Sequence, residues 1–103
     1  MRDTLHYPMK TPYTTEQSAR LQELLLILKK TSTIYKKANN SQRIKLFDMS
    51  LKYVDELVDT FGWYRDFSES LLMFGSEFLS VPSMMHNPLY RSLFPEAYKI
   101  FNL

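Results

Sequence analysis

Three acidic residues lie close together in the sequence, at a spacing that could bind a metal ion. Asp55 and Asp59 are four residues apart with Glu56 between them, and in a helix this spacing places two carboxylates on one face. Carboxylates of this kind hold iron in di-iron helical bundles, but those sites also need Glu-x-x-His motifs on other helices. The chain contains no such motif. We therefore expect a solvated helix face here and no metal site.

The sequence offers little for other kinds of catalysis. It contains no cysteine, which excludes disulfides, thiolate metal ligands and cysteine nucleophiles. The two histidines, His6 and His86, are far apart, and with only two isolated glycines the chain has no phosphate-binding loop. No nucleophile and base are arranged together. We predict that the protein is not an enzyme and needs no cofactor.

A run of basic residues is the first candidate binding site. The first 47 residues hold nine Lys/Arg against three Asp/Glu, while the remainder holds four against eight. The run contains no acid and consists of Lys29, Lys30, Lys36, Lys37, Arg43 and Lys45. It straddles a predicted turn between two helices, so helix ends could gather the charges into a Lys-rich elbow that contacts phosphates of a nucleic acid. A solvated face is the interpretation that we prefer.

Aromatic residues are the second candidate. Seven Phe, seven Tyr and one Trp make up 15% of the chain, and Trp, Tyr and Arg are over-represented in the hot spots of protein interfaces. The candidate partner-binding residues are Tyr7, Tyr13, Trp63, Tyr64 and Arg65. The alternative is that the aromatic residues around Gly62 form a hydrophobic cap on one end of a bundle, and the sequence alone favours that alternative.

The strongest apolar repeat predicts the helix that positions these groups. Within residues 40–62 a seam of apolar residues recurs at steps of three and four: Ile44, Phe47, Leu51, Val54, Val58 and Phe61. A second apolar strip lies beside the seam and contains Leu46, Met49, Tyr53 and Leu57. A helix that is apolar over so much of its circumference needs more than one neighbour. We expect it to be the central helix of the fold.

Capping signals predict the first helix and its connection to the second. Thr14 and Gln17 have the spacing of a capping box, and an apolar face that includes Leu21 and Leu28 extends the first helix to about Ala38. A short turn over residues 39–41 should follow, with Asn40 or Ser41 capping the next helix. So short a connection makes the two helices antiparallel.

Gly62 should end the central helix, because glycine adopts the left-handed conformation found after helix ends. The alternative is one long helix over residues 41–81, kinked at Gly62. We prefer a break and a third helix from Asp66, capped by its carboxylate, to Val81. Prolines then start two short helical segments near residues 88 and 95, which we expect to dock on the second apolar strip.

The sequence thus predicts an all-α fold, a small helical bundle of three main helices plus one or two short C-terminal helical segments. Residues 1–103 should form a single domain, with residues 1–13 as an extended N-terminal arm. No apolar run approaches the ~18 residues of a membrane span and no secretory signal is present, so we expect a soluble, cytoplasmic protein.

The leading functional hypothesis is a non-enzymatic protein–protein interaction module that binds another protein or a second copy of itself. It would be a small adaptor, inhibitor or assembly subunit, for example from a phage or another mobile element. One alternative is a nucleic-acid-associated accessory protein that uses the Lys-rich elbow. Another is a helical bundle of the bacteriocin-immunity type, which the chain resembles in size, basicity and helical class.

Overall fold

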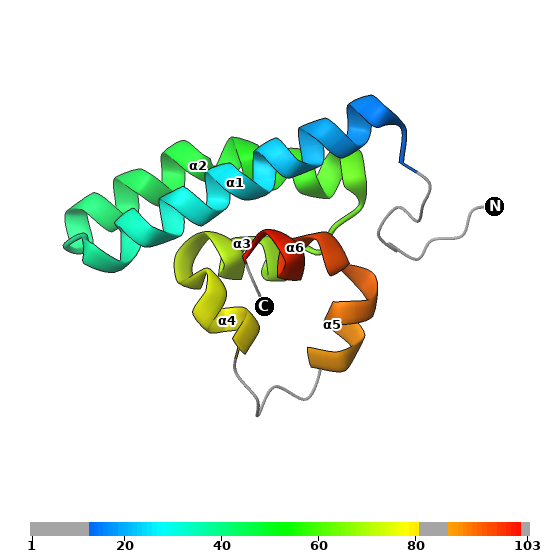
Figure 1. Cartoon of the computed structure of the whole chain (residues 1–103). Helices are drawn as coiled ribbons and strands as arrows, with labels where there is room; N and C mark the ends of the chain where they lie inside the picture. Colours follow the sequence, from blue (N-terminus) through cyan, green and yellow to red (C-terminus); the bar gives the residue numbers. More distant parts are fainter. Residues whose placement is uncertain (1–12, 81–86, 102–103) are drawn as a thin grey trace.

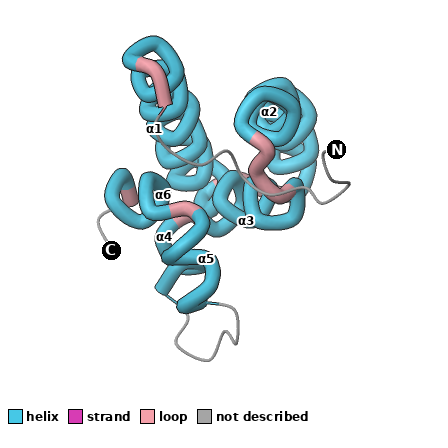
Figure 2. The backbone as a smooth tube through the Cα atoms, turned by 90° about the vertical axis from the view of Figure 1, so that its right-hand side faces the viewer, coloured by secondary structure: helices cyan, strands magenta, loops and turns pink. Residues whose placement is uncertain are grey.

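The computed structural model describes residues 13–80 and 87–101 and shows an all-α fold, which confirms the predicted fold class (Figure 1). Within these ranges the chain forms six helices and no strand. The helices are α1 (Thr15–Lys37), α2 (Asn40–Phe61), α3 (Arg65–Phe74), α4 (Ser76–Ser80), α5 (Asn87–Leu93) and α6 (Pro95–Ile100). Helices α1 and α2 form one layer, and α3 to α6 form a second layer against it (Figure 2).

The start of α1 follows the predicted capping box. The backbone N–H of Gln17 donates to Thr14 Oγ1 at 3.0 Å, and the N–H of Thr14 donates to Gln17 Oε1 at 2.9 Å. One face of the helix then lies wholly in the core and consists of Leu21, Leu24, Leu25, Leu28 and Ser32. The prediction for this helix is confirmed.

The cap of α2 is Asn39 rather than Asn40 or Ser41. Asn39 Oδ1 accepts a hydrogen bond from the N–H of Gln42 at 2.9 Å, and Gln42 Oε1 accepts one from the N–H of Asn39 at 3.0 Å. Only Asn39 has a glutamine three residues later, so only it can form this reciprocal pair. The short connection makes α1 and α2 an antiparallel hairpin, as predicted (Figure 1).

Helix α2 is not the central helix, contrary to the prediction from its apolar repeat. Its second half is buried through Val54, Leu57 and Phe61, but in its first half Ile44 is 64% exposed and Met49 is 69% exposed. The central position belongs to α3, which packs against α1, α2 and α4 and carries Phe67, stacked on Phe94, whereas α2 packs against α1 and α3. Because α3 spans about 15 Å and α2 about 33 Å, α3 cannot cover the whole of α2.

The predicted break at Gly62 is confirmed, because Gly62 has a φ of 72° and ends α2 in the left-handed conformation. The predicted cap of α3 is wrong. Helix α3 begins at Arg65, after Tyr64, and its N-cap has no side-chain hydrogen bond. Asp66 lies instead in the first turn, where a carboxylate interacts favourably with the helix dipole.

The predicted third helix is also shorter than expected, because it ends at Phe74 and a new helix begins at Ser76. Between them Gly75 has φ 60° and ψ −133°, a conformation that essentially only glycine adopts. A Cβ atom on Gly75 would lie 2.5 Å from Ser32 Oγ, so this turn approaches α1 closely enough to require glycine. The predicted end at Val81 lies outside the described residues.

The C-terminal helices pack on the body of the protein, but not on the second apolar strip of α2. Helix α6 contacts α1 and α5, and Phe94, between α5 and α6, stacks on Phe67 of α3 at 4.2 Å. Lys29 Nζ also donates to the carbonyl oxygen of Ile100 at 3.0 Å. The predicted docking site was wrong because the aromatic surface that the C-terminal helices pack on belongs to α3. The sequence did not show the extent of that helix.

Most of the predicted N-terminal arm, including Tyr7, lies outside the described residues. Tyr13 is described; it is partly buried and packs edge-on against Phe61 with ring centroids 5.9 Å apart. Across residues 13–80 and 87–101, no helix combines the length and the apolar character needed to span a membrane.

Candidate partner-binding groove

Two hollows lie along the junction of α2 and α3. The elbow hollow, near the α1–α2 turn, has a volume of about 570 Å³ and is lined by Tyr35, Asn40, Arg43, Ile44, Phe47, Asp48 and Met73. The glycine hollow, near Gly62, has a volume of about 420 Å³ and is lined by Val58, Gly62, Trp63, Tyr64, Arg65, Asp66 and Tyr90. Ile44 and Val58 are fourteen residues apart and so lie within about 40° of each other around α2. The two hollows therefore open on one side of α2, and together we call them the α2–α3 groove.

The apolar part of this groove comes from residues that the sequence placed in the core. Phe47, Leu51 and Val58 of the seam are only partly buried, and Ile44 is 64% exposed. Met73 adds a partly buried side chain from α3. Sequence analysis missed this surface because it treated the seam as buried along its whole length.

Arg65 lines the glycine hollow and bridges the two helices of the groove. Its Nη2 donates to Asp55 Oδ1 at 2.8 Å, and its Nη1 lies 3.8 Å from Glu69 Oε2. The hydrogen bond to Asp55 raises the pKa of the Arg65 guanidinium above its ordinary value, and the charges of Asp55, Glu69 and Asp59 act in the same direction. Arg65 thus joins α3 to α2 and holds several carboxylates around one cation.

The rim of the groove carries more negative than positive charge. The acidic side chains along it are Asp48, Asp55, Asp59, Asp66 and Glu69, and the basic ones are Arg43, Arg65 and, by its position on α2, Lys52. Arg43 is engaged, since it donates to the carbonyl oxygens of Tyr35 at 2.9 Å and Lys36 at 3.1 Å. Its role is to satisfy the last carbonyls of α1.

The predicted partner-binding residues around Gly62 divide between core and surface. Trp63 is 2% exposed and packs on Phe94 with ring centroids 4.7 Å apart, as in a hydrophobic cap. Tyr64 is half-buried, with its ring 5.3 Å from that of Phe94, and Arg65 is exposed. The structure therefore brings all three to the glycine hollow, with Trp63 in its wall and the other two within reach of a partner.

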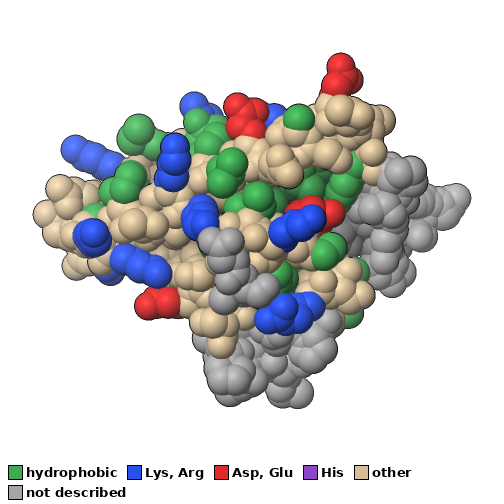
Figure 3. Space-filling model, in the orientation of Figure 1, with side chains coloured by type: hydrophobic (Ala, Val, Ile, Leu, Met, Phe, Trp, Pro, Cys, Tyr) green, Lys and Arg blue, Asp and Glu red, His purple; other side chains and the backbone are tan. Residues whose placement is uncertain are grey.

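The predicted nucleic-acid-binding residues differ in their surroundings. Lys29 is bound to the carbonyl of Ile100, Arg43 caps α1, and Lys36 lies 3.7 Å from Glu77. Lys30, Lys37 and Lys45 are exposed. On α1, Lys30 and Lys37 lie about 100° around the helix from Lys29 and Lys36. Figure 3 shows basic side chains spread over this face, with several of them near its left end.

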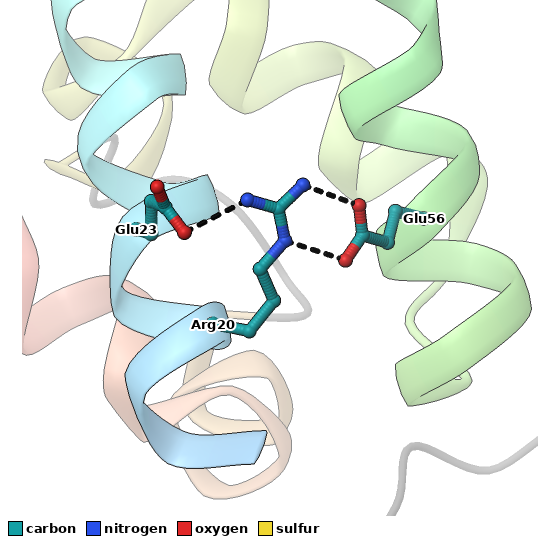
Figure 4. A network of polar contacts seen from close by, with 3 residues as sticks. All are labelled: Arg20, Glu23 and Glu56. Carbon is teal, nitrogen blue, oxygen red and sulfur yellow. Dashed lines mark hydrogen bonds and ion pairs between the residues drawn. The ribbon is translucent and has the colours of Figure 1, made fainter. Parts of the chain in front are cut away.

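Asp55 and Glu56, which are adjacent in the sequence, contact different partners. Asp55 faces Arg65, whereas Glu56 accepts two hydrogen bonds from Arg20 of α1, both at 2.7 Å, and Arg20 also binds Glu23 at 2.8 Å (Figure 4). The hydrogen bonds from Arg20 hold the pKa of Glu56 below its ordinary value. In the part of the chain that the structure describes, no three His, Cys, Asp or Glu side chains are arranged to hold a metal ion.

The groove is therefore the surface on which apolar groups, concave shape and unbalanced charge coincide. The sequence indicates Trp63, Tyr64 and Arg65 of this site but not Ile44, Phe47 and Met73. Comparisons of the chain with known protein families, with curated proteins and with solved structures found no match.

Proposed function

We propose that this protein is a non-enzymatic protein–protein interaction module and that the α2–α3 groove is its binding surface. The observation that carries the proposal is the elbow hollow, where the 64% exposed Ile44 stands beside Phe47 and Met73. Exposed apolar side chains gathered together and rimmed by polar residues are typical of surfaces that bind another protein. An adaptor, an inhibitor or an assembly subunit would each act through such a surface without chemistry of its own.

The balance of apolar and charged groups supports a protein as the partner. Burying Ile44, Phe47 and Met73 under a second chain would remove apolar surface from water, at about 25 cal/mol per Å² before the costs of association. The acidic rim would in turn orient the partner and exclude ligands of like charge. Tyr64 and Arg65 provide the residue types that most often dominate binding energy.

A peptide selection tests the proposal without knowledge of the partner. Peptides selected from a random library on the immobilised protein should bind with a Kd that rises at least about tenfold in Ile44→Arg. The matched control is Ile34→Arg, because Ile34 is an isoleucine with 55% exposure that does not line the groove. Peptides that bind the wild type and both variants equally would show that the groove is not the binding surface.

A nucleic-acid-associated function is the second candidate, favoured by the exposure of Lys30, Lys37 and Lys45. Phosphate binding would weaken steeply as salt rises and would be lost when these three lysines are changed to glutamine. Docking of a partner in the α2–α3 groove should survive that change. A bacteriocin-immunity role, an origin in a phage or mobile element, and a cytoplasmic location stay predictions, since nothing in the groove bears on them.

A further inference from the structure

We propose that the segment bound in the α2–α3 groove is a basic amphipathic helix with two large apolar side chains eleven residues apart. This inference rests on the proposed function and adds to it the conformation, charge and anchor spacing of the partner. It follows from the positions of the two hollows, the ion pair between them and the charge of the rim.

The anchor spacing follows from the distance between the hollows. Phe47 lies in the elbow hollow and Val58 in the glycine hollow, and eleven residues of α2 separate them by about 16 Å. Side chains eleven positions apart on a second helix are also about 16 Å apart and lie within about 20° of one face. A helix lying along α2 therefore presents one side chain to each hollow, in the manner of other helices bound in grooves.

The middle of the groove requires polar groups on the partner. Along their helices, Asp55 lies between Phe47 and Val58, and Glu69 lies between Arg65 and Met73, so both carboxylates that Arg65 contacts fall between the hollows. A large apolar side chain there would desolvate these charges without replacing their hydrogen bonds to water, which costs free energy. Small or polar residues between the two anchors avoid that cost.

The rim selects a basic helix. Asp48, Asp59 and Asp66 are exposed, while Arg43 and Arg65 are already engaged with carbonyl and carboxylate oxygens. Arg65 offsets one of its two carboxylate partners, and with Lys52 the rim holds three cations against five acidic side chains, which leaves a net negative surface. Lysines or arginines on the flanks of the bound helix would meet it with opposite charge, which speeds encounter and rejects acidic competitors.

A second copy is the alternative occupant. An antiparallel pair of α2 helices centred on Leu51 would bury the seam residues against themselves. It would place Asp48 of one copy beside Asp55 of the other, but it would also place Arg43 opposite Asp59. The charges of α2 therefore do not decide against a dimer, and sedimentation tests it. The acidic rim repels nucleic acid.

Designed helical peptides test the inference. The probe is a fluorescein-labelled, lactam-stapled helix of about 18 residues with leucines eleven positions apart and lysines on both flanks. Two control peptides replace its lysines by glutamates or place its leucines seven positions apart, which keeps the face and shortens the spacing. Fluorescence anisotropy should show that the probe binds the protein at least about tenfold more tightly than either control.

The protein variants complete the test. Ile44→Arg should weaken probe binding at least about tenfold, whereas Ile34→Arg should leave it unchanged. Combined Asp48→Lys, Asp59→Lys and Asp66→Lys should reverse the preference, so that the glutamate peptide binds more tightly. These three aspartates are exposed, so the combined variant should keep the helical circular dichroism of the wild type.

The outcomes that contradict the inference differ from those that contradict the proposed function. Equal binding of the lysine and glutamate peptides would refute the predicted charge, and equal binding of both leucine spacings would refute the two anchors. In either case a loss of binding in Ile44→Arg would still support the groove. If Ile44→Arg leaves peptide binding unchanged, or if none of the peptides binds, the groove is not the binding surface. A dimer in sedimentation that Ile44→Arg dissociates would identify a second copy as the occupant and overturn the inference.

Discussion

The two halves of α2 carry the same apolar repeat and have different surroundings. In the half near Gly62, Val54, Leu57 and Phe61 are at most 1% exposed. In the half near the elbow, Ile44 and Met49 are more than 60% exposed. An apolar repeat therefore identifies the face of a helix that a partner can cover, and the length of the neighbouring helix decides where that face is covered inside the protein.

The difference follows from the end of α3. This helix runs back from Gly62 and stops at Phe74, and Met73 is its residue in the elbow hollow. At the other end, the aromatic rings of Trp63, Phe67 and Phe94 pack together, with Phe67 and Phe94 stacked at 4.2 Å. The half near Gly62 supplies most of the buried residues of α2, and the half near the elbow supplies Ile44, the most exposed apolar residue of the groove that we propose binds a partner.

The largest expected effect is a difference in stability between substitutions in the two halves of α2. Leu57→Ala should lower the free energy of unfolding by about 2–5 kcal/mol, because it opens a cavity in a fully buried site. Ile44→Ala should change it by less than about 0.5 kcal/mol, because Ile44 is exposed. Urea denaturation followed by circular dichroism measures both. Equal losses in the two variants would mean that the halves of α2 are equally buried in solution.

The second prediction concerns the residue that ends α3. Gly75→Ala should cost about 2–3 kcal/mol, because alanine is strained at this φ and ψ and its Cβ would clash with Ser32. Gly62→Ala is the matched control. Because only the left-handed backbone conformation disfavours alanine there, it should lower the free energy of unfolding by about 1 kcal/mol.

A double variant separates strain from clash at the same site. Adding Ser32→Gly to Gly75→Ala removes the side chain that the new Cβ meets, although glycine inside α1 itself costs up to about 1 kcal/mol. The two changes should therefore cost less together than the sum of their separate costs. Strictly additive costs would show that Gly75 does not approach α1 closely in solution.

The smallest expected effect concerns the pair Arg20–Glu56, which links α1 to the buried half of α2 (Figure 4). The side chains are 40% and 29% exposed, so after solvent screening Glu56→Gln should cost only about 0.5–1 kcal/mol at neutral pH. The folded-state pKa of Glu56 is lowered. Its contribution is therefore present above the unfolded pKa of about 4.5 and is lost as pH falls through the folded value.

Urea denaturation between pH 3 and pH 7 checks this, since the gap between wild type and Glu56→Gln should close at the acid end. In an Arg20→Gln background the same change should have almost no effect at any pH, because its hydrogen-bond partner is gone. A constant gap across the whole range would show that Glu56 is not bound to Arg20.

The sequence by itself determined the local features of this protein. The capping box at Thr14 and Gln17, the break at Gly62, the antiparallel hairpin and the all-α class each follow from the sequence. Each depends on residues within a few positions of one another, because caps, turns and helical repeats are set by hydrogen bonds across three or four residues. The predicted cap at Asp66 was wrong because local spacing alone does not set the start of α3. Its start depends on how the chain packs around Tyr64.

Only the tertiary structure decided which predicted face is core and which is surface. The approach of Gly75 to Ser32, the bond of Lys29 to Ile100 and the pair Arg20–Glu56 all join residues at least 36 positions apart. The apolar repeat of one helix gives no information about the length of the helix that packs against it. The α2–α3 groove exists because a short α3 lies against a long α2, and that mismatch is a property of the packed chain rather than of either segment.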